Sequence, residues 1–195
     1  MNKVEVKRIS YYPPSKGYAV LLQEAEGSRS LPIIVGSSEA QAIALYLEGV
    51  DMPRPMTHDL LIHILENLEG EITQVTIARI NNGTFYAEIE ISNPHMGEMV
   101  IDSRPSDALA VALRTHTPIF VTDEVMTAAG IDTDNGEGEI VEPVTSDELT
   151  KEASEETVLE NLNEALEKAV TEEEYEVAAR LRDRIKQLEK KSTPQ

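Results

Sequence analysis

The chain has 195 residues, and its 36 Asp and Glu outnumber its 17 Lys and Arg, which gives a formal net charge of −19. It contains no Cys, which excludes disulfides, thiolate metal sites and Cys nucleophiles, and no stretch approaches the roughly 18 apolar residues that a membrane span needs. We therefore expect a soluble, cytoplasmic protein without a membrane partner, and the negative charge argues against generic binding to a phosphate backbone.

The beginning of the chain predicts three strands followed by a helix. The strands are expected where apolar runs stand between turn signals, at residues 4–9, 18–22 and 31–35. The helix is expected at residues 38–47. Ala40 and Ala44 lie one turn apart on it and give it a strip of small residues that can pack closely on a sheet. A further helix is expected at residues 57–68, after two prolines.

The same order of three strands and a helix then returns. The strands are expected at residues 72–77, 85–91 and 99–101, and the helix at residues 105–114. A short strand at residues 119–121 and a short helix that ends at residue 129 are expected after it. An ungapped comparison at an offset of 68 matches 8 of 28 positions, where chance gives about two. Glu39 and Asp107 become equivalent, each in the first turn of its helix. We infer an α+β domain of two internally duplicated βββα units, with a largely antiparallel sheet.

Acidic charge is concentrated after the second unit. Residues 1–131 hold 9 basic and 17 acidic residues, residues 132–160 hold 1 and 11, and residues 161–195 hold 7 and 8, so the net charges are −8, −10 and −1. Dense like charge with few apolar residues is typical of a solvated linker. We therefore divide the chain into a domain at 1–131, a flexible acidic linker at 132–154 and a C-terminal module at 155–191.

The C-terminal module predicts two helices in an antiparallel hairpin. Its apolar residues recur at spacings of three and four: Leu159, Leu162, Leu166 and Ala169, then Tyr175, Ala178, Leu181, Ile185 and Leu188. Thr171 and Glu174 form a capping box at the start of the second helix. Each helix offers a single narrow apolar stripe, so the hairpin buries little by itself and needs a partner.

The pattern Tyr175-Glu-x-Ala178-Ala179-x-Leu181-Arg182-Asp-x-Ile185 resembles the UVR motif of UvrB and UvrC. The resemblance implies a helical hairpin that pairs with a like hairpin or with a partner protein. It implies partner contacts at Tyr175, Ala178, Ala179, Leu181, Arg182 and Ile185. The alternative is an unrelated solvated hairpin, in which Arg182 is only a surface charge.

Polar residues gather at the entrances of two predicted helices, in residues 36–39 with 54–59 and in residues 102–107. Carboxylates and hydroxyls there can simply cap free amides and complement the helix dipole. Capping does not account for Arg54 and Arg104, because the same dipole disfavours a cation; each is expected to pair with a carboxylate or to bind an anion such as phosphate. Asp59 and His63, one helical turn apart, could share a metal, with a solvated or capping pair as the favoured alternative.

Five segments in this order and spacing resemble the bifunctional nuclease (BFN) domain family. They are Leu31-Pro-Ile-Ile-Val-Gly36-x-x-Glu39 with the residues up to Ala44, Arg54-Pro-Met-Thr-His58-Asp59-Leu60, Gly83-Thr-Phe85-Tyr86-Ala87, Ile101-Asp102-Ser-Arg104-Pro-Ser106-Asp107 with the residues up to Arg114, and Pro118-Ile-Phe-Val121. The resemblance extends over nearly all of residues 4–131. It implies a nuclease that acts on DNA or RNA. From the polar residues of these segments we nominate a candidate catalytic site: Glu39, Arg54, His58, Asp59, Asp102, Arg104 and Asp107.

A metal-dependent phosphodiesterase needs carboxylates to hold divalent ions and a cation to stabilise the transition state. Asp102, Asp107, Glu39 and Asp59 offer the carboxylates, of which we assign the first three to Mg²⁺ or Mn²⁺. Arg54 and Arg104, at the two helix entrances, offer the cation that stabilises the transition state.

A domain of net charge −8 with nine Lys and Arg has little surface for holding a long polymer. We therefore predict a nuclease of short or single-stranded DNA or RNA, whose hairpin docks a protein partner, and we expect a homo-oligomer. The alternative is a non-catalytic assembly or anion-binding module that acts through protein partners, in which the arginine–carboxylate clusters are structural. Charge favours the module, and the family resemblance favours the enzyme.

Overall fold

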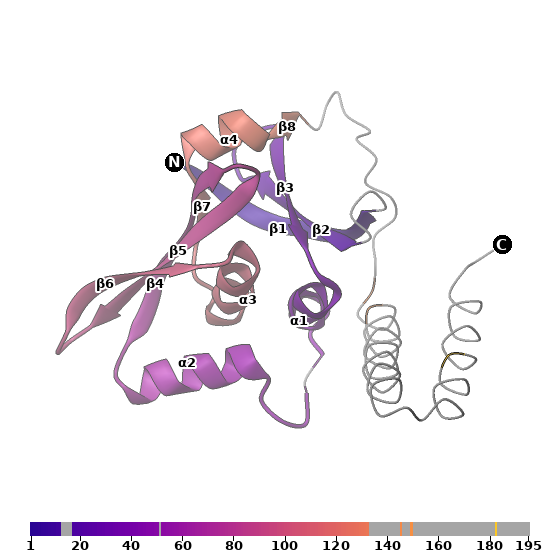
Figure 1. The fold of residues 1–195 in the computed structure, drawn as a ribbon. Helices are drawn as coiled ribbons and strands as arrows, with labels where there is room; N and C mark the ends of the chain where they lie inside the picture. Colours follow the sequence, from indigo (N-terminus) through magenta and orange to yellow (C-terminus); the bar gives the residue numbers. More distant parts are fainter. Residues whose placement is uncertain (13–16, 51, 133–144, 146–148, 150–181, 183–195) are drawn as a thin grey trace, which may run out of the picture. The chain divides into compact units, whose positions relative to one another are not determined.

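A computed structural model of the chain describes residues 1–12, 17–50, 52–132, 145, 149 and 182. The chain divides into two compact units, Met1–Ser146 and Asp147–Gln195, and the fold below is that of the first unit (Figure 1). The predicted hairpin and nearly all of the predicted linker lie outside the described residues. The three-part division of the chain therefore stays a prediction.

The first unit alternates strands and helices as the apolar pattern predicts. Its strands are β1 (Asn2–Tyr12), β2 (Gly17–Glu24), β3 (Arg29–Val35), β4 (Glu71–Asn81), β5 (Thr84–Asn93), β6 (Gly97–Ser103), β7 (Ile119–Val121) and β8 (Ile131–Asp132). Its helices are α1 (Ser37–Leu47), α2 (Thr57–Asn67), α3 (Pro105–Thr115) and α4 (Asp123–Ala129). Among these helices, none combines the length and apolar character of a membrane span.

Eight strands of the described residues form one sheet in the order β6-β5-β4-β7-β1-β2-β3-β8. Neighbouring strands pair antiparallel except β4 and β7, which pair parallel. The predicted α+β class with a largely antiparallel sheet is confirmed. Strand β7 lies between β1 and β4 and so joins the first three strands to the next three, a long-range pairing that a local pattern does not reveal. The internal duplication stays a prediction of the sequence comparison.

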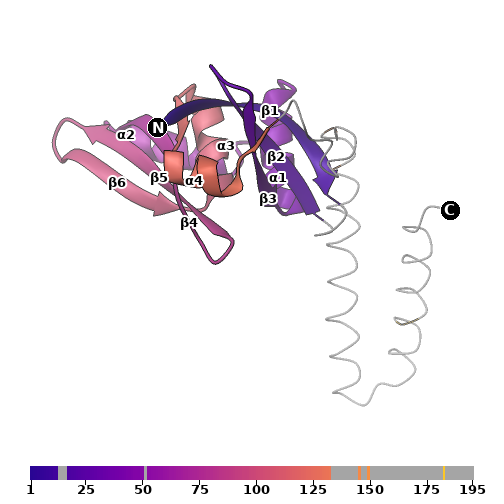
Figure 2. The same cartoon turned by 90° about the horizontal axis from the view of Figure 1, so that it is seen from above.

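Helices α1 and α3 pack against each other on one face of the sheet, and α4 lies on the other face (Figures 1 and 2). Ala40 and Ala44 of α1 and Ala108 and Ala112 of α3 are all at most 2% exposed. Because small side chains let helix backbones approach closely, the first turns of α1 and α3 are held near each other. This packing positions the polar residues at the two helix entrances.

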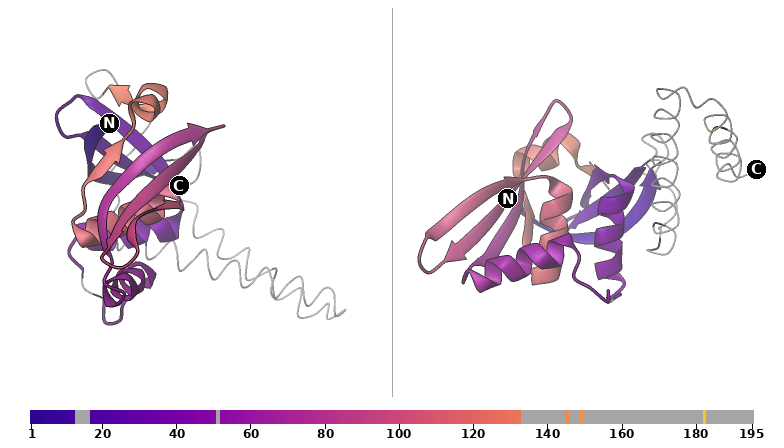
Figure 3. Two further views of the ribbon diagram at one scale, coloured as in Figure 1. Left: turned by 90° about the vertical axis from the view of Figure 1, so that its left-hand side faces the viewer. Right: turned by 60° about the horizontal axis from the view of Figure 1, so that its bottom comes forward.

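Helix α2 packs on α3 rather than on the sheet (Figure 3). None of its residues is buried, and Leu60, Leu61 and Ile64 are each about half exposed. The helix therefore leaves an apolar face uncovered within the described part of the chain.

Candidate functional site

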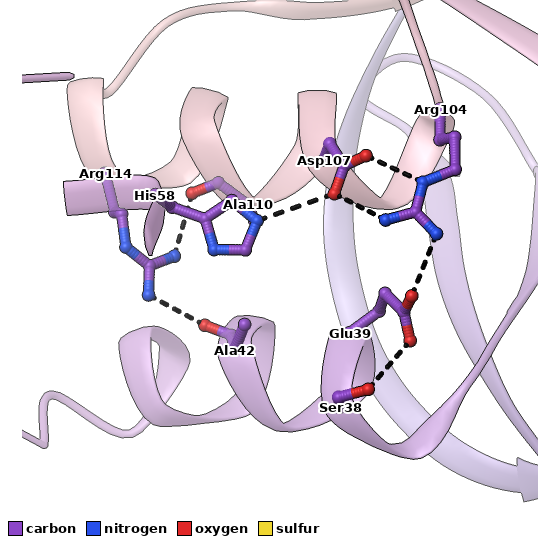
Figure 4. A network of polar contacts seen from close by, with 8 residues as sticks. All are labelled: Ser38, Glu39, Ala42, His58, Arg104, Asp107, Ala110 and Arg114. Atoms are coloured by element: carbon purple, nitrogen blue, oxygen red, sulfur yellow. Dashed lines mark hydrogen bonds and ion pairs between the residues drawn. The ribbon is translucent and has the colours of Figure 1, made fainter. Parts of the chain in front are cut away.

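Arg104 joins the first turns of α1 and α3. Its Nε and Nη2 atoms donate to the two carboxylate oxygens of Asp107, at 2.8 and 3.1 Å, and its Nη1 donates to Oε1 of Glu39 at 3.0 Å. The hydroxyl of Ser38 donates to the other oxygen of Glu39, at 3.3 Å. The structure thus brings three of the predicted site residues, Glu39, Arg104 and Asp107, into one cluster (Figure 4).

The local sequence explains where Arg104 stands. It is the N-cap residue of α3 and has an extended backbone, the conformation that the following Pro105 imposes on its neighbour. Its side chain therefore starts just outside the helix and can turn back to Asp107, one helical turn further on. The positive end of the helix dipole disfavours the guanidinium there, and the Asp107 and Glu39 carboxylates offset that cost.

Arg104 is the exposed member of the cluster. Its side chain is 66% exposed, against 34% for Asp107 and 23% for Glu39. The hydrogen bonds with Asp107 raise the pKa of Arg104, so the guanidinium stays charged at any physiological pH. Its three hydrogen bonds to carboxylates use three of the five N–H donors of a guanidinium, and one N–H on each terminal nitrogen remains. The cluster therefore presents an exposed cation with unused donors.

His58, at the start of α2, reaches the same cluster from the other side. Its Nε2 lies 3.6 Å from Oδ1 of Asp107, and its side chain is 14% exposed. Its Nδ1 is buried and has no hydrogen-bond partner within the described residues. Because Nδ1 is closed off from solvent, the ring nitrogen that a ligand can reach is Nε2, beside Asp107.

Asp59 belongs to a second ion pair that ties three helices together. Its Oδ2 accepts from the Met56 amide at 2.7 Å, which makes it the capping residue of α2, and its Oδ1 accepts from Nε of Arg114 at 2.7 Å. The Arg114 side chain is 8% exposed and also donates to the carbonyls of Ala110, at 2.8 Å, and Ala42, at 3.0 Å. Asp59 therefore caps α2, one of the two roles expected for it, and its other oxygen accepts from Arg114.

The pKa of Asp59 makes this contact sensitive to acid. Burial alone would raise the pKa of Asp59, but hydrogen bonds from the Met56 amide and from Arg114 outweigh it and hold the pKa below its ordinary value. A lowered pKa stabilises the fold in full above the ordinary aspartate value, and the stabilisation is lost as the pH falls through the lower folded value.

We expect Asp59→Asn to be less stable than the wild type at pH 7, and the difference to shrink as the pH falls below about 5 and through the lowered folded pKa of Asp59. Urea unfolding followed by tyrosine fluorescence at a series of pH values measures it. The control variant is Asp132→Asn, which removes another acidic residue of the first unit. A stability difference for Asp59→Asn that is constant from pH 7 to pH 3 would contradict the assignment.

Besides Asp59, two more of the predicted site residues lie outside the Arg104 cluster. Asp102, near the end of β6, pairs instead with Arg79 of β4 at 3.4 Å, and both side chains are more than half exposed. Arg54, in the segment before α2, is exposed and makes no hydrogen bond or ion pair within the part of the chain that the structure describes. Of the predicted partner-contact residues, only Arg182 is described, and it is helical and exposed.

The carboxylates do not fit a divalent ion as they are arranged. Glu39 and Asp107 both bind the guanidinium of Arg104, and Asp102 binds Arg79. Across the described ranges, no group of three or more His, Asp and Glu side chains lies close enough to hold a metal ion. Mg²⁺ or Mn²⁺ would have to displace an arginine from each of these carboxylates.

Arg114 is the main contact residue that the sequence analysis did not assign. It stands in the last turn of α3, where a basic residue ordinarily only complements the helix dipole. The signal available was its place one helical turn after Ala110, which puts the two residues on the same side of α3. Its ion pair with Asp59 depends on α2 lying beside α3, which the local sequence does not show.

The fold and the cluster define an α+β domain with a polar site at the entrances of two packed helices. The chain belongs to the bifunctional nuclease domain family, which matches residues 20–134. The UvrB/UvrC motif matches residues 156–191. Both predicted resemblances are thereby confirmed.

Two kinds of relatives resemble the chain. An uncharacterized protein of Mycobacterium tuberculosis is 39% identical over 152 residues, which are 77% of this chain and 90% of the relative. Bifunctional nuclease 1 of Arabidopsis thaliana is 25% identical over 191 residues, or 92% of this chain and 58% of the relative. Bifunctional nuclease 2 of Oryza sativa subsp. japonica is 27% identical over 116 residues, or 58% and 36%. The chain thus spans about a third to three fifths of these plant nucleases.

Proposed function

We propose that the chain is a nuclease that hydrolyses phosphodiester bonds in short or single-stranded DNA or RNA. The observation that carries the proposal is Arg104, a two-thirds exposed guanidinium between two carboxylates at paired helix entrances. Membership of the bifunctional nuclease domain family supports the same reaction class. Phosphoryl transfer needs a cation for the phosphate oxygens and a group that takes a proton from the attacking water, and the cluster offers both.

Arg104 would bind the scissile phosphate through the N–H groups that Glu39 and Asp107 leave unused. Asp107, whose carboxylate is one-third exposed, would accept the proton of the attacking water. His58 would hold Asp107 in place through its Nε2 and so act as a positioning residue. Family membership is compatible with Mg²⁺ or Mn²⁺, but the carboxylates as arranged do not fit such an ion, so the metal is an arm of the assay below rather than a step of this scheme.

The test is cleavage of labelled single-stranded DNA and RNA by the full chain, with Mg²⁺, with Mn²⁺ or with EDTA. We expect Asp107→Asn to lower the initial rate at least about tenfold, with Glu39 beside it as the remaining proton acceptor. The matched control is Asp123→Asn, which changes an aspartate in the first turn of α4. Equal rates for Asp107→Asn and the wild type would indicate a contaminating nuclease and would overturn the proposal.

A second candidate function, a non-catalytic assembly module, is favoured by one observation. Both carboxylates of the cluster are already neutralised by Arg104, and the pair Asp59–Arg114 shows the same kind of contact in a buried setting. In this case the arginines clamp α1, α2 and α3 together. No cleavage by the wild type under any metal condition, together with intact folding, would favour this candidate.

The proposal includes a protein partner and self-association. The UvrB/UvrC motif at residues 156–191 supports docking of the C-terminal hairpin to a protein partner. The half-exposed Leu60, Leu61 and Ile64 of α2 support the expected homo-oligomer, since contiguous exposed apolar side chains are typical of interaction surfaces. A pull-down that is unchanged after deletion of residues 155–195 would remove the docking part of the proposal.

A further inference from the structure

A pocket opens directly beside Arg104. It has a volume of about 370 Å³ and lies between the end of β3, the start of α3 and the turn that joins β4 to β5. Arg104 and Glu39 are the charged residues of its lining, and Ile34, Phe85 and Pro105 belong to its apolar lining. An exposed cation at the rim of an apolar hollow is the arrangement that binds a ligand with one charged and one flat apolar part.

The β4–β5 turn sets the position of Phe85, the aromatic residue that lines the pocket. Asn82 and Gly83 both have positive φ, at 49° and 78°, and Asn81 pairs with Thr84, so the turn is a two-residue hairpin of the kind that Asn-Gly favours. Phe85 follows this turn at the start of β5 and lines the pocket. Its neighbour Tyr86 points to the opposite face, where its ring lies 4.3 Å from the guanidinium of Arg79. The tight turn therefore holds one ring in the pocket and one outside it.

The apolar floor is open enough to take a ligand. Ile34, which lines the pocket, is 44% exposed, although its neighbours on β3, Ile33 and Val35, are buried. A large apolar side chain left uncovered beside an aromatic ring is a contact surface for a flat, weakly polar group. Sugar and phosphate alone would not use such a surface.

We propose that this pocket is a nucleobase subsite, in which one unpaired base of a single-stranded nucleic acid lies against Phe85 while the adjoining phosphate reaches Arg104. The inference deepens the proposed function and rests on it for the class of polymer. A base inside a duplex is covered on both sides by its neighbours and cannot enter a concave pocket without leaving the stack. Stacking on an aromatic ring also tolerates any base and adds affinity that does not depend on many Lys and Arg, which suits a domain of net charge −8.

The test compares three fluorescein-labelled probes of equal length by anisotropy: an oligo(dT) strand, a strand of abasic nucleotides and a duplex. We expect the full chain to bind oligo(dT) about tenfold more tightly than the abasic strand, which carries the same phosphates without bases. Phe85→Ala should abolish this preference, and Phe85→Trp should keep it. The matched control is Tyr86→Ala, which removes a ring from the other face of the same strand and should keep the preference.

A second variant covers the case in which Phe85→Ala does not fold. Ile34→Asp places a charge on the pocket floor and should also abolish the preference, whereas Val100→Asp, at a 63% exposed position on β6, should not. Equal affinity of the wild type for oligo(dT) and the abasic strand overturns the subsite, as does a loss of preference in Tyr86→Ala. A base preference that depends on Phe85 without cleavage of any strand keeps the subsite and overturns the nuclease.

Discussion

Arg104→Ala is expected to lower the rate of cleavage of single-stranded DNA or RNA by about 10²–10³-fold, the loss typical of removing one preorganised donor to a developing negative charge. The reason is that Arg104 is the one exposed cation of the cluster and holds the unused N–H groups. Initial rates at saturating and limiting substrate separate the effect on kcat from that on KM. We expect kcat to fall more than KM rises, because the charge on the phosphoryl oxygens grows in the transition state.

Two variants make this result specific. Arg104→Lys keeps the charge but cannot bind Asp107 through two parallel hydrogen bonds and Glu39 through a third, so we expect an intermediate rate. Arg8→Ala removes an exposed arginine of β1 and should cleave at the rate of the wild type. Equal loss in Arg104→Ala and Arg8→Ala would mean that only net charge matters, and Arg104 would then have no place in the site.

The local pattern of the sequence predicts the elements but not their arrangement. Alternation and turn residues locate the strands, and the Asn-Gly turn correctly marks the β4–β5 hairpin. The central position of β7 could not be predicted, because this three-residue strand is placed by its hydrogen-bonded pairing with β1 and β4, which are far away in the chain. Strand β8 has two residues and no apolar pattern of its own.

In the candidate site, too, the sequence predicts the position of each residue in its element but not which residues come into contact. Glu39 and Asp107 could be predicted to lie at equivalent helix starts, but their common contact with Arg104 depends on how closely α1 and α3 pack. Asp102 stands in the same motif as Asp107, yet it lies on a strand and pairs across the sheet with Arg79. The sequence motif therefore placed Asp102 and Asp107 in one predicted site, although Asp102 lies on a strand and Asp107 on the helix that follows it.

Phe85 and Arg114 stand in segments that resemble the family, but the local sequence does not show what either residue contacts. Phe85 fits the expected alternation of a half-buried strand, and its pocket exists only because β3 and α3 end beside the β4–β5 turn. Arg114 gains its three partners from three different helices. Both residues acquire their roles from tertiary packing.

The larger effect on folding is expected at Arg114. Arg114→Met keeps most of the side-chain volume, but it leaves the Asp59 carboxylate without its guanidinium partner and removes the side-chain donor to the carbonyls of Ala42 and Ala110. Removing one partner of a buried ion pair costs about 3–5 kcal/mol, and we expect a value near 3 kcal/mol because Asp59 is one-third exposed and regains water. Urea unfolding measures it, and tyrosine fluorescence reports on this domain because five of the six tyrosines lie in residues 1–131.

A surface arginine provides the comparison for this loss. Arg79→Ala removes an exposed guanidinium that pairs with Asp102 and covers the ring of Tyr86, and it should cost at most about 1 kcal/mol. In the double variant Asp59→Asn with Arg114→Met, the loss should be smaller than the sum of the two single losses, because the unpaired carboxylate is gone. Additive losses would show that Asp59 and Arg114 act independently, and the ion pair would then not be what joins α2 to α3.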